Sequence, residues 1–173
     1  MFGRAYGAIG FLAAVICPLP SSALPSQVML PSDLAVKVAR EAIQQCRQKG
    51  YGVTAVVMNS EGNVIVQIRG DGARVHTVAT ARAKAYSAIT LAAIHNLQRT
   101  SELLGSMQST GAIGIGSWPM PPQPIKDITL FPGGVNLVAD GQIIAALGVA
   151  GTPDGKIDEK CASQAKDYFE ANL

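Results

Sequence analysis

The stretch of the sequence richest in reactive side chains runs from Arg69 to Thr77, Arg-Gly-Asp-Gly-Ala-Arg-Val-His-Thr. It places an imidazole, two guanidinium groups and a carboxylate next to a predicted helix start. The imidazole of His76 can bind a metal ion or transfer a proton, and Arg69 and Arg74 can hold an anion. A solvated loop histidine is the plain alternative. The stretch therefore predicts a candidate site for an anionic or metal-containing ligand.

A second candidate is Phe131-Pro132-Gly133-Gly134, where two adjacent glycines precede a predicted strand. Such glycines let a ligand approach the backbone closely and can present N–H groups to an anion. A tight turn into the strand explains the same pair equally well. The segment lacks the Lys and Ser/Thr of a phosphate-binding loop, and the sequence contains no Gly-x-Ser-x-Gly elbow and no closely spaced Cys/His set. Hydrolytic machinery is therefore not predicted, and no catalytic residue is assigned.

Composition limits the class of protein. A chain of 173 residues with 48% hydrophobic and 15% charged residues can bury one core, which predicts a single domain. A formal charge of +2 and nine aromatic residues argue against nucleic acid as a partner. Between Leu24 and Arg99 nine basic residues stand against four acidic ones, whereas residues 100–173 carry four basic and eight acidic ones. An anionic ligand is expected near the first half.

Residues 1–23 have the pattern of a secretory signal. Arg4 precedes an apolar run over 5–17, and Ser21-Ser22-Ala23 supplies the small residues that a cleavage site needs. The run is shorter than the roughly 18 to 20 residues of a membrane-spanning helix, which favours a cleaved signal over a membrane anchor. We expect an exported protein, periplasmic or extracellular, with one domain over 24–173 and no membrane span after cleavage.

Two cysteines follow the predicted cleavage site, Cys46 and Cys161. Export would place them in an oxidising compartment, where a cysteine pair usually bonds. Cys46 lies on the apolar stripe of a helix predicted over 33–49, and Cys161 on the apolar face of a helix predicted over 157–172. A disulfide forms if these helices lie side by side. Two buried free thiols are the alternative.

The elements between these helices point to the fold class. Valine-rich runs on either side of short turns predict two hairpins, over 52–69 and 134–149. Helical segments are predicted over 78–97 and 101–107, followed by a long loop over 108–133 that is rich in glycine and proline. We therefore expect an α+β fold, with an antiparallel sheet of about four to five strands packed with N-terminal, central and C-terminal helices.

Several different short motifs follow one another along the chain in a specific order. They are Gly70-Asp71-Gly72-Ala73, Ala83-Lys84-Ala85, Pro132-Gly133-Gly134, Leu147-Gly148-Val149-Ala150-Gly151 and Asp158-Glu159-Lys160-Cys161. Their order and spacing resemble the GlcG/HbpS family of heme-binding proteins, over about residues 34–173. The resemblance implies an α+β domain that forms homo-oligomers and binds heme. Some members of the family are linked to heme degradation or iron handling, and the resemblance implies such a role as well.

The resemblance marks individual positions of this chain. Those that match the family's motifs are Asp71, Gly72, Ala73, Lys84, Gly133 and Gly134. A motif can be kept for the fold or a subunit contact as well as for a ligand. The chain departs from the family's pattern at Asn136, where proline is common, and at Ala150, where serine is common.

Heme suits these residues chemically. Its propionates need cations, its ring needs an apolar surface, and its iron needs an axial donor such as imidazole. The sequence therefore predicts a heme site near the start of the central helix with His76 on the iron, while His95 is the weaker of the two histidines. The predicted cofactor-binding set is His76, Arg69, Asp71, Arg74, Lys84, Gly133 and Gly134.

Two other functions use the same residues. In a binder or enzyme for a small carboxylate such as glycolate, Arg69, Lys84 and the Gly133–Gly134 amides hold the anion while His76 acts as acid or base. An oligomeric accessory or sensor protein is the other possibility. Heme requires a wide apolar slot and a glycolate-sized ligand does not, so the shape of the site separates the first two functions.

Overall fold

The computed structural model describes residues 27–109 and 126–173. The predicted signal at 1–23 and the middle of the predicted loop over 108–133 lie outside the described residues. The elements, in order, are α1 (Ser32–Arg47), β1 (Thr54–Asn59), β2 (Val64–Arg69), α2 (Thr77–Ser87), the π-helical turn η1 (Ala88–Ala92), α3 (Thr100–Ser109), β3 (Gly134–Ala139), β4 (Gln142–Ala150) and α4 (Gly155–Glu170).

The sheet is antiparallel and has four strands in the order β2-β1-β4-β3. Each hairpin contributes one edge strand and one central strand, and the central pair joins the hairpins with Val57 opposite Leu147. A single bridge from Arg99 to Val135 extends the β3 edge. The predicted α+β class and the antiparallel sheet built from two hairpins are confirmed.

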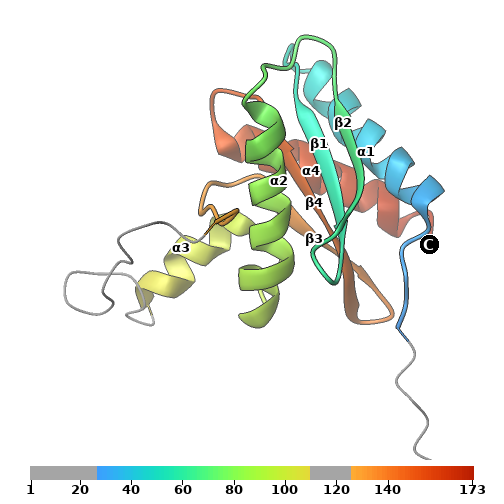
Figure 1. Cartoon of the computed structure of the whole chain (residues 1–173), viewed down its shortest axis with the longest axis vertical. Coiled ribbons are helices and arrows are strands. Elements are labelled where there is room, and N and C mark those ends of the chain that lie inside the picture. The colour runs from blue at the N-terminus through green and yellow to red at the C-terminus, as the bar shows by residue number, and fades with distance from the viewer. Residues whose placement is uncertain (1–26, 110–125) are drawn as a thin grey trace, which may run out of the picture.

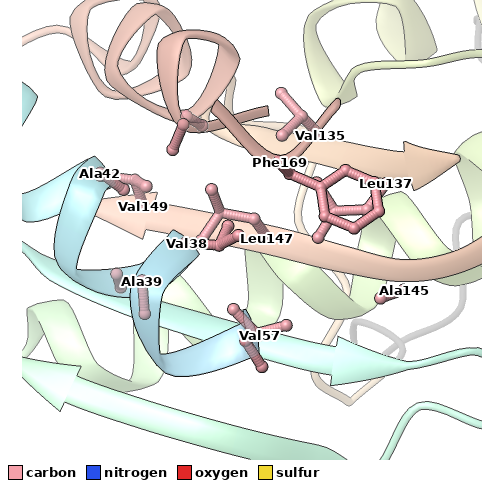
Figure 2. Close-up of a cluster of buried hydrophobic side chains, with 14 of the residues drawn as sticks. Val38, Ala39, Ala42, Val57, Val135, Leu137, Ala145, Leu147, Val149 and Phe169 are labelled. Carbon is pink, nitrogen blue, oxygen red and sulfur yellow. The ribbon is translucent and has the colours of Figure 1, made fainter. Parts of the chain in front are cut away.

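Helices cover both faces of this sheet. Helix α2 lies on one face, and α1 and α4 lie side by side on the other (Figure 1). The larger core forms between α1, α4 and the sheet, where Val38, Leu147 and Phe169 are fully buried (Figure 2). Because both of their faces are covered, β1 and β4 are apolar almost without alternation, as expected for doubly buried strands.

Helix α2 approaches the backbones of β3 and β4 closely. A Cβ at Gly148 would clash with the carbonyl oxygen of Ala81, and a Cβ at Gly134 would clash with the carbonyl oxygen of Lys84. The alanines of the helix face, Ala81 and Ala85, are fully buried. These glycines and alanines therefore serve the close approach of helix and strand backbones.

The central helix expected over 78–97 is observed as one helical run from Thr77 to Ile94, within which Ala88–Ala92 form a π-helical turn that the sequence did not predict. There Thr90 donates its hydroxyl hydrogen to the carbonyl of Tyr86, and buried Ser87 accepts a hydrogen bond from the Thr129 amide. Such hydroxyl-to-backbone bonds compete with the regular ladder and bend helices.

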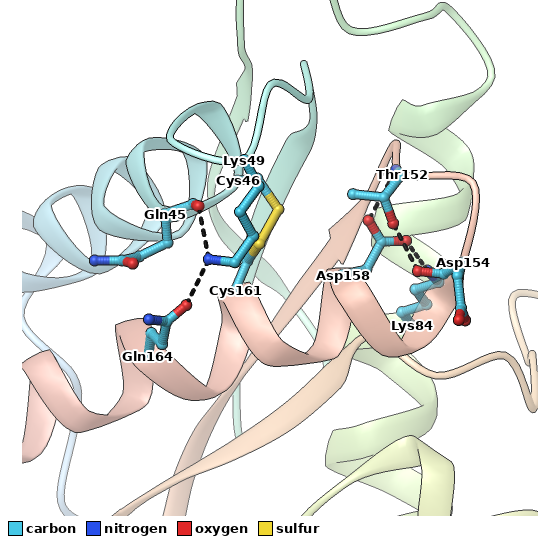
Figure 3. The surroundings of a disulfide bond; sticks show 9 residues. All are labelled: Gln45, Cys46, Lys49, Lys84, Thr152, Asp154, Asp158, Cys161 and Gln164. Carbon is cyan, nitrogen blue, oxygen red and sulfur yellow. Dashed lines mark hydrogen bonds and ion pairs between the residues drawn. A yellow bond between two sulfur atoms is a disulfide. The ribbon is translucent and has the colours of Figure 1, made fainter.

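A disulfide joins α1 to α4, as the sequence predicted. Cys46 and Cys161 have their Cα atoms 5.6 Å apart, and both residues are fully buried (Figure 3). Beside this bond the Lys49 ammonium donates to Gln164 Oε1 at 2.9 Å and to the carbonyl of Gln45 at 3.0 Å. The two terminal helices are thus fixed to each other covalently and by side-chain hydrogen bonds.

None of the helices over 27–109 and 126–173 has the length and apolarity needed to cross a membrane.

Candidate functional site

The start of α2 is fixed by a pair of buried threonines. The hydroxyls of Thr54 and Thr77 lie 2.7 Å apart, and Thr77 donates to the carbonyl of Arg74 at 2.6 Å. Since a hydroxyl has one hydrogen to give, Thr54 is the donor in the shared bond. This chain of bonds ties the first turn of α2 to β1 and places His76 at the helix N-cap, where it is exposed.

A cavity of about 170 Å³ opens beside His76. Its lining also includes Thr77, Thr80, Lys84, Phe131, Ala150, Thr152, Gly155 and Asp158. The residues come from α2, from the end of β4, from the first turn of α4 and from the segment before β3. His76 and Phe131 are exposed, whereas Lys84 and Asp158 are buried, so the latter two form the inner part of the cavity.

Lys84 and Asp158 form a buried ion pair in this inner part. Lys84 Nζ lies 2.7 Å from Asp158 Oδ2, and the two side chains are 4% and 3% exposed. The other oxygen, Asp158 Oδ1, accepts a hydrogen bond from the Thr152 amide at 3.0 Å (Figure 3). Both oxygens of the carboxylate are thus engaged, while the ammonium, which has three hydrogens to donate, has Asp158 as its partner among the described residues.

Glu159, the next residue, binds the turn before β3 and the start of α3. Its Oε2 accepts from the Gly133 amide at 3.3 Å, from the Ser101 amide at 3.0 Å and from the Thr100 hydroxyl at 3.4 Å. Thr100 Oγ1 in turn accepts from the Gly134 amide at 2.9 Å. Both glycine amides that the sequence offered to an anion are therefore bonded within the protein in this structure.

The loop between β2 and α2 is held by its own charged side chains. Arg69 donates through Nε and Nη2 to the carbonyl of Ala73, at 2.9 and 2.6 Å. Asp71 pairs with Arg47 at 2.6 Å between exposed side chains. The loop lines an open, shallow hollow on the surface, and Arg74 is exposed there.

The predicted cofactor-binding set therefore divides into three groups. His76 and Lys84 line the cavity, and Arg69, Asp71 and Arg74 belong to the neighbouring loop. Gly133 and Gly134 are not in the cavity lining, and their amides donate to Glu159 and Thr100.

Asp158 and Glu159 were not predicted as site residues, although both belong to the motif Asp158-Glu159-Lys160-Cys161. A signal was present, because two adjacent carboxylates in the first turn of a helix can be explained by the helix dipole alone or by buried partners elsewhere. The structure shows the second: both residues are buried, at 2% and 7% exposure.

Two exposed apolar residues are associated with His76, one next to it in the chain and one in the same cavity lining. Val75 precedes His76 and is 77% exposed, and Phe131, which lines the cavity with His76, is 70% exposed. Exposed apolar side chains beside a potential metal donor suit a flat apolar ligand or a partner surface.

Known proteins share this fold. A crystal structure of a double mutant of Streptomyces reticuli HbpS has 28% identity and a TM-score of 0.69, and the match covers 90% of this chain and 97% of that one. Klebsiella pneumoniae protein ORFY has 25% identity and a TM-score of 0.71, covering 89% and 99%. The structure titled "Crystal Structure of PduOC:Heme Complex" has 23% identity and a TM-score of 0.66, covering 81% and 94%, a likeness of fold.

A search of the curated proteins found no match. The model of the family described as "Haem degrading protein HbpS-like" matches residues 30–167, which include the cavity, the ion pair and both disulfide cysteines. The resemblance expected from the sequence motifs is thereby confirmed, and the chain belongs to the HbpS-like family.

Proposed function

We propose that this chain is an exported heme-binding protein that binds the heme iron through His76 at the mouth of the cavity. The observation that carries the proposal is the exposed imidazole of His76 with exposed apolar residues near it: Val75 precedes it in the chain, and Phe131 lines the same cavity. An imidazole is a common axial ligand of heme iron, and the ring needs apolar contacts. The family description, with its reference to heme, supports the same ligand.

The cavity itself is not the wide apolar slot that heme requires, because its volume of about 170 Å³ is smaller than the roughly 300 to 1,000 Å³ of typical cofactor sites. The apolar surface offered to the ring is the exposed side chain of Phe131, which lines the cavity, and that of Val75, which lines the neighbouring hollow. Heme bound there would supply iron for storage, sensing or degradation, and the chain's own residues would supply the axial donor, the apolar contacts and the cationic partners.

A homo-oligomer is part of this proposal. One copy offers the ring an exposed surface at the mouth and cannot enclose it. A second copy that covers the same patch would bury Val75 and Phe131 and exclude water from the iron. This proposal agrees with the assembly that the family resemblance implies.

The second candidate function is binding or conversion of a small carboxylate. The cavity volume favours it, because a ligand of a few heavy atoms fits inside beside Lys84 and His76. In that case His76 acts as acid or base and no apolar slot is needed.

One experiment separates the two functions. The mature protein, residues 24–173, is titrated with heme and followed by visible absorbance, while a panel of small α-hydroxy acids is tested by thermal shift. Heme binding predicts a saturable change of the Soret band. No change with heme, together with stabilisation by a carboxylate, would move the function to the small ligand.

Export is tested separately by the mass of the secreted chain. Cleavage after Ala23 predicts a mature N-terminus at Leu24. The disulfide between α1 and α4 supports an oxidising location.

A further inference from the structure

Lys84 differs from the other basic residues near the site. The Arg69 guanidinium is used in closing its own loop, and Arg74 is exposed on that loop. Lys84 is the basic residue in the lining of the cavity, and its side chain is 4% exposed. An ammonium can donate three hydrogen bonds, and among the described residues Asp158 accepts one of them. The cavity therefore contains a buried cation with donor capacity left for a ligand.

Glycine at position 133 keeps the space beside this ammonium open. A Cβ at Gly133 would lie 2.6 Å from the carbonyl oxygen of Val149 and 2.8 Å from both Nζ and Cδ of Lys84. The residue also has φ of +131°, which favours glycine. Any side chain at this position would displace the ammonium, so the position of Lys84 depends on this glycine.

The hydroxyls in the lining offer lone pairs rather than hydrogens. Thr77 donates to the carbonyl of Arg74, Thr80 to that of His76 at 3.1 Å, and Thr152 to that of Asp154 at 2.6 Å. Asp158 adds two more acceptor atoms. The Lys84 ammonium is thus the group in the lining with charge and hydrogens to offer an anion.

These features limit the class of anion. The Lys84–Asp158 pair is neutral as a whole, and a bound dianion such as phosphate would bring two negative charges and three acceptor oxygens close to Asp158. A carboxylate brings one charge and can accept from the ammonium alone. The free-energy cost of burying a carboxylate among these acceptor atoms is therefore lower than that of burying a phosphate.

We infer that the cavity is a carboxylate-binding subsite, in which Lys84, shared with Asp158, holds a carboxylate of the bound ligand while the remainder of the ligand lies at the mouth. This inference rests on the proposed function for the case of heme, whose carboxylate is a propionate. A free small carboxylate would bring the same chemistry. The site thereby selects ligands by an acid group as well as by an iron atom.

The test compares heme with heme dimethyl ester, in which the propionates are blocked, on the mature protein. Visible absorbance gives the affinity for each. Wild type is expected to bind heme about tenfold or more tightly than the ester, because a charge-assisted hydrogen bond contributes on that scale. Equal affinities would overturn the inference and leave the proposed heme function standing.

Two variants of the pair are predicted to move the affinity in opposite directions. Lys84→Met should weaken heme binding about tenfold and leave the ester unchanged. Asp158→Asn should strengthen heme binding, because the ammonium is then no longer shared, and should also leave the ester unchanged. The exposed Lys37, changed to Met, is the control that keeps wild-type affinities. A fold defect cannot produce tighter binding, so Asp158→Asn keeps the test decisive even if Lys84→Met does not fold.

Propionate and glycolate, tested by thermal shift, distinguish the source of the carboxylate. Stabilisation by either acid that is lost in Lys84→Met, with no binding of heme or its ester, would support the subsite and overturn the heme function. No effect of either acid and no preference for heme over its ester would overturn the subsite.

Discussion

Lys84 and Asp158 are 74 residues apart in the sequence, yet they form an ion pair of 2.7 Å at 4% and 3% exposure. The pair connects α2 to the first turn of α4, one turn before the disulfide cysteine Cys161. Elements that lie on opposite faces of the sheet thus meet at the cavity. The position of this site therefore depends on contacts that hold the whole domain together.

The ion pair predicts a stability difference between single and double variants. Lys84→Met leaves the Asp158 carboxylate buried without its partner, which should lower the free energy of unfolding by about 3 to 5 kcal/mol. The double variant Lys84→Met/Asp158→Leu removes both charges, so its free energy of unfolding should fall by clearly less than that of Lys84→Met. Urea denaturation measures both. A double variant less stable than the single one would contradict this account of the pair.

Glu159 predicts a loss of stability at the turn before β3. Glu159→Ala leaves the amides of Gly133 and Ser101 without their acceptor, and should lower the free energy of unfolding by about 2 to 4 kcal/mol. Glu102 is a matched control, since it also accepts from two amides, those of Gln98 and Arg99, but at the surface. Glu102→Ala should cost about 1 kcal/mol. Equal losses of unfolding free energy in the two variants, measured by urea denaturation, would contradict a larger contribution from the buried Glu159.

Two glycines predict opposite effects of the same substitution. Gly148→Ala should destabilise the protein by about 3 kcal/mol or prevent folding, because the new Cβ meets the backbone of α2 at Ala81. Gly105 lies within α3, and among the described residues no atom outside the surrounding helix backbone and its two chain neighbours comes within 4 Å of the equivalent Cβ. Gly105→Ala should raise stability by about 0.5 to 1 kcal/mol through helix propensity. Thermal denaturation distinguishes the two, and a tolerated Gly148→Ala would be evidence against the close packing.

The disulfide predicts a redox-dependent stability. Replacing Cys46 and Cys161 together by alanine should lower the free energy of unfolding by about 2 to 5 kcal/mol, since the bond closes a loop with a sequence separation of 115. A reductant should destabilise the wild type on prolonged incubation in urea and should not affect the double variant. Detection of two free thiols in the denatured, unreduced protein would contradict the bond.

The local elements could be predicted because their signals are local. Apolar spacing gave helices close to the observed Ser32–Arg47 and Gly155–Glu170, and the valine-rich runs gave both hairpins. The disulfide followed from two cysteines on the inward faces of helices that share one side of the sheet. The π-helical turn after Ser87 was not predicted, and buried Ser87 at its start bonds to Thr129, which is distant in sequence.

The site was predicted only in part, because burial and pairing are not local properties. Lys84 was expected to hold the anion of a ligand, and in the structure its ammonium forms a buried ion pair with Asp158. Gly133 and Gly134 were expected to offer amides to an anion, whereas those amides bind Glu159 and Thr100. The stretch around His76 was found from side-chain chemistry alone, and the cavity beside it required the fold.

The central claim, that His76 at the start of α2 binds the heme iron, is tested most directly by comparing His76→Ala with His95→Ala. Both histidines are exposed. His95 comes after the π-helical turn in the chain and is not among the residues that line the cavity. Heme is titrated into each variant and into wild type, and the Soret position and the affinity are compared. The account predicts that His76→Ala shifts the Soret band and weakens binding at least tenfold, as expected for loss of an axial ligand, while His95→Ala behaves as wild type. An unchanged spectrum and affinity in His76→Ala would contradict it.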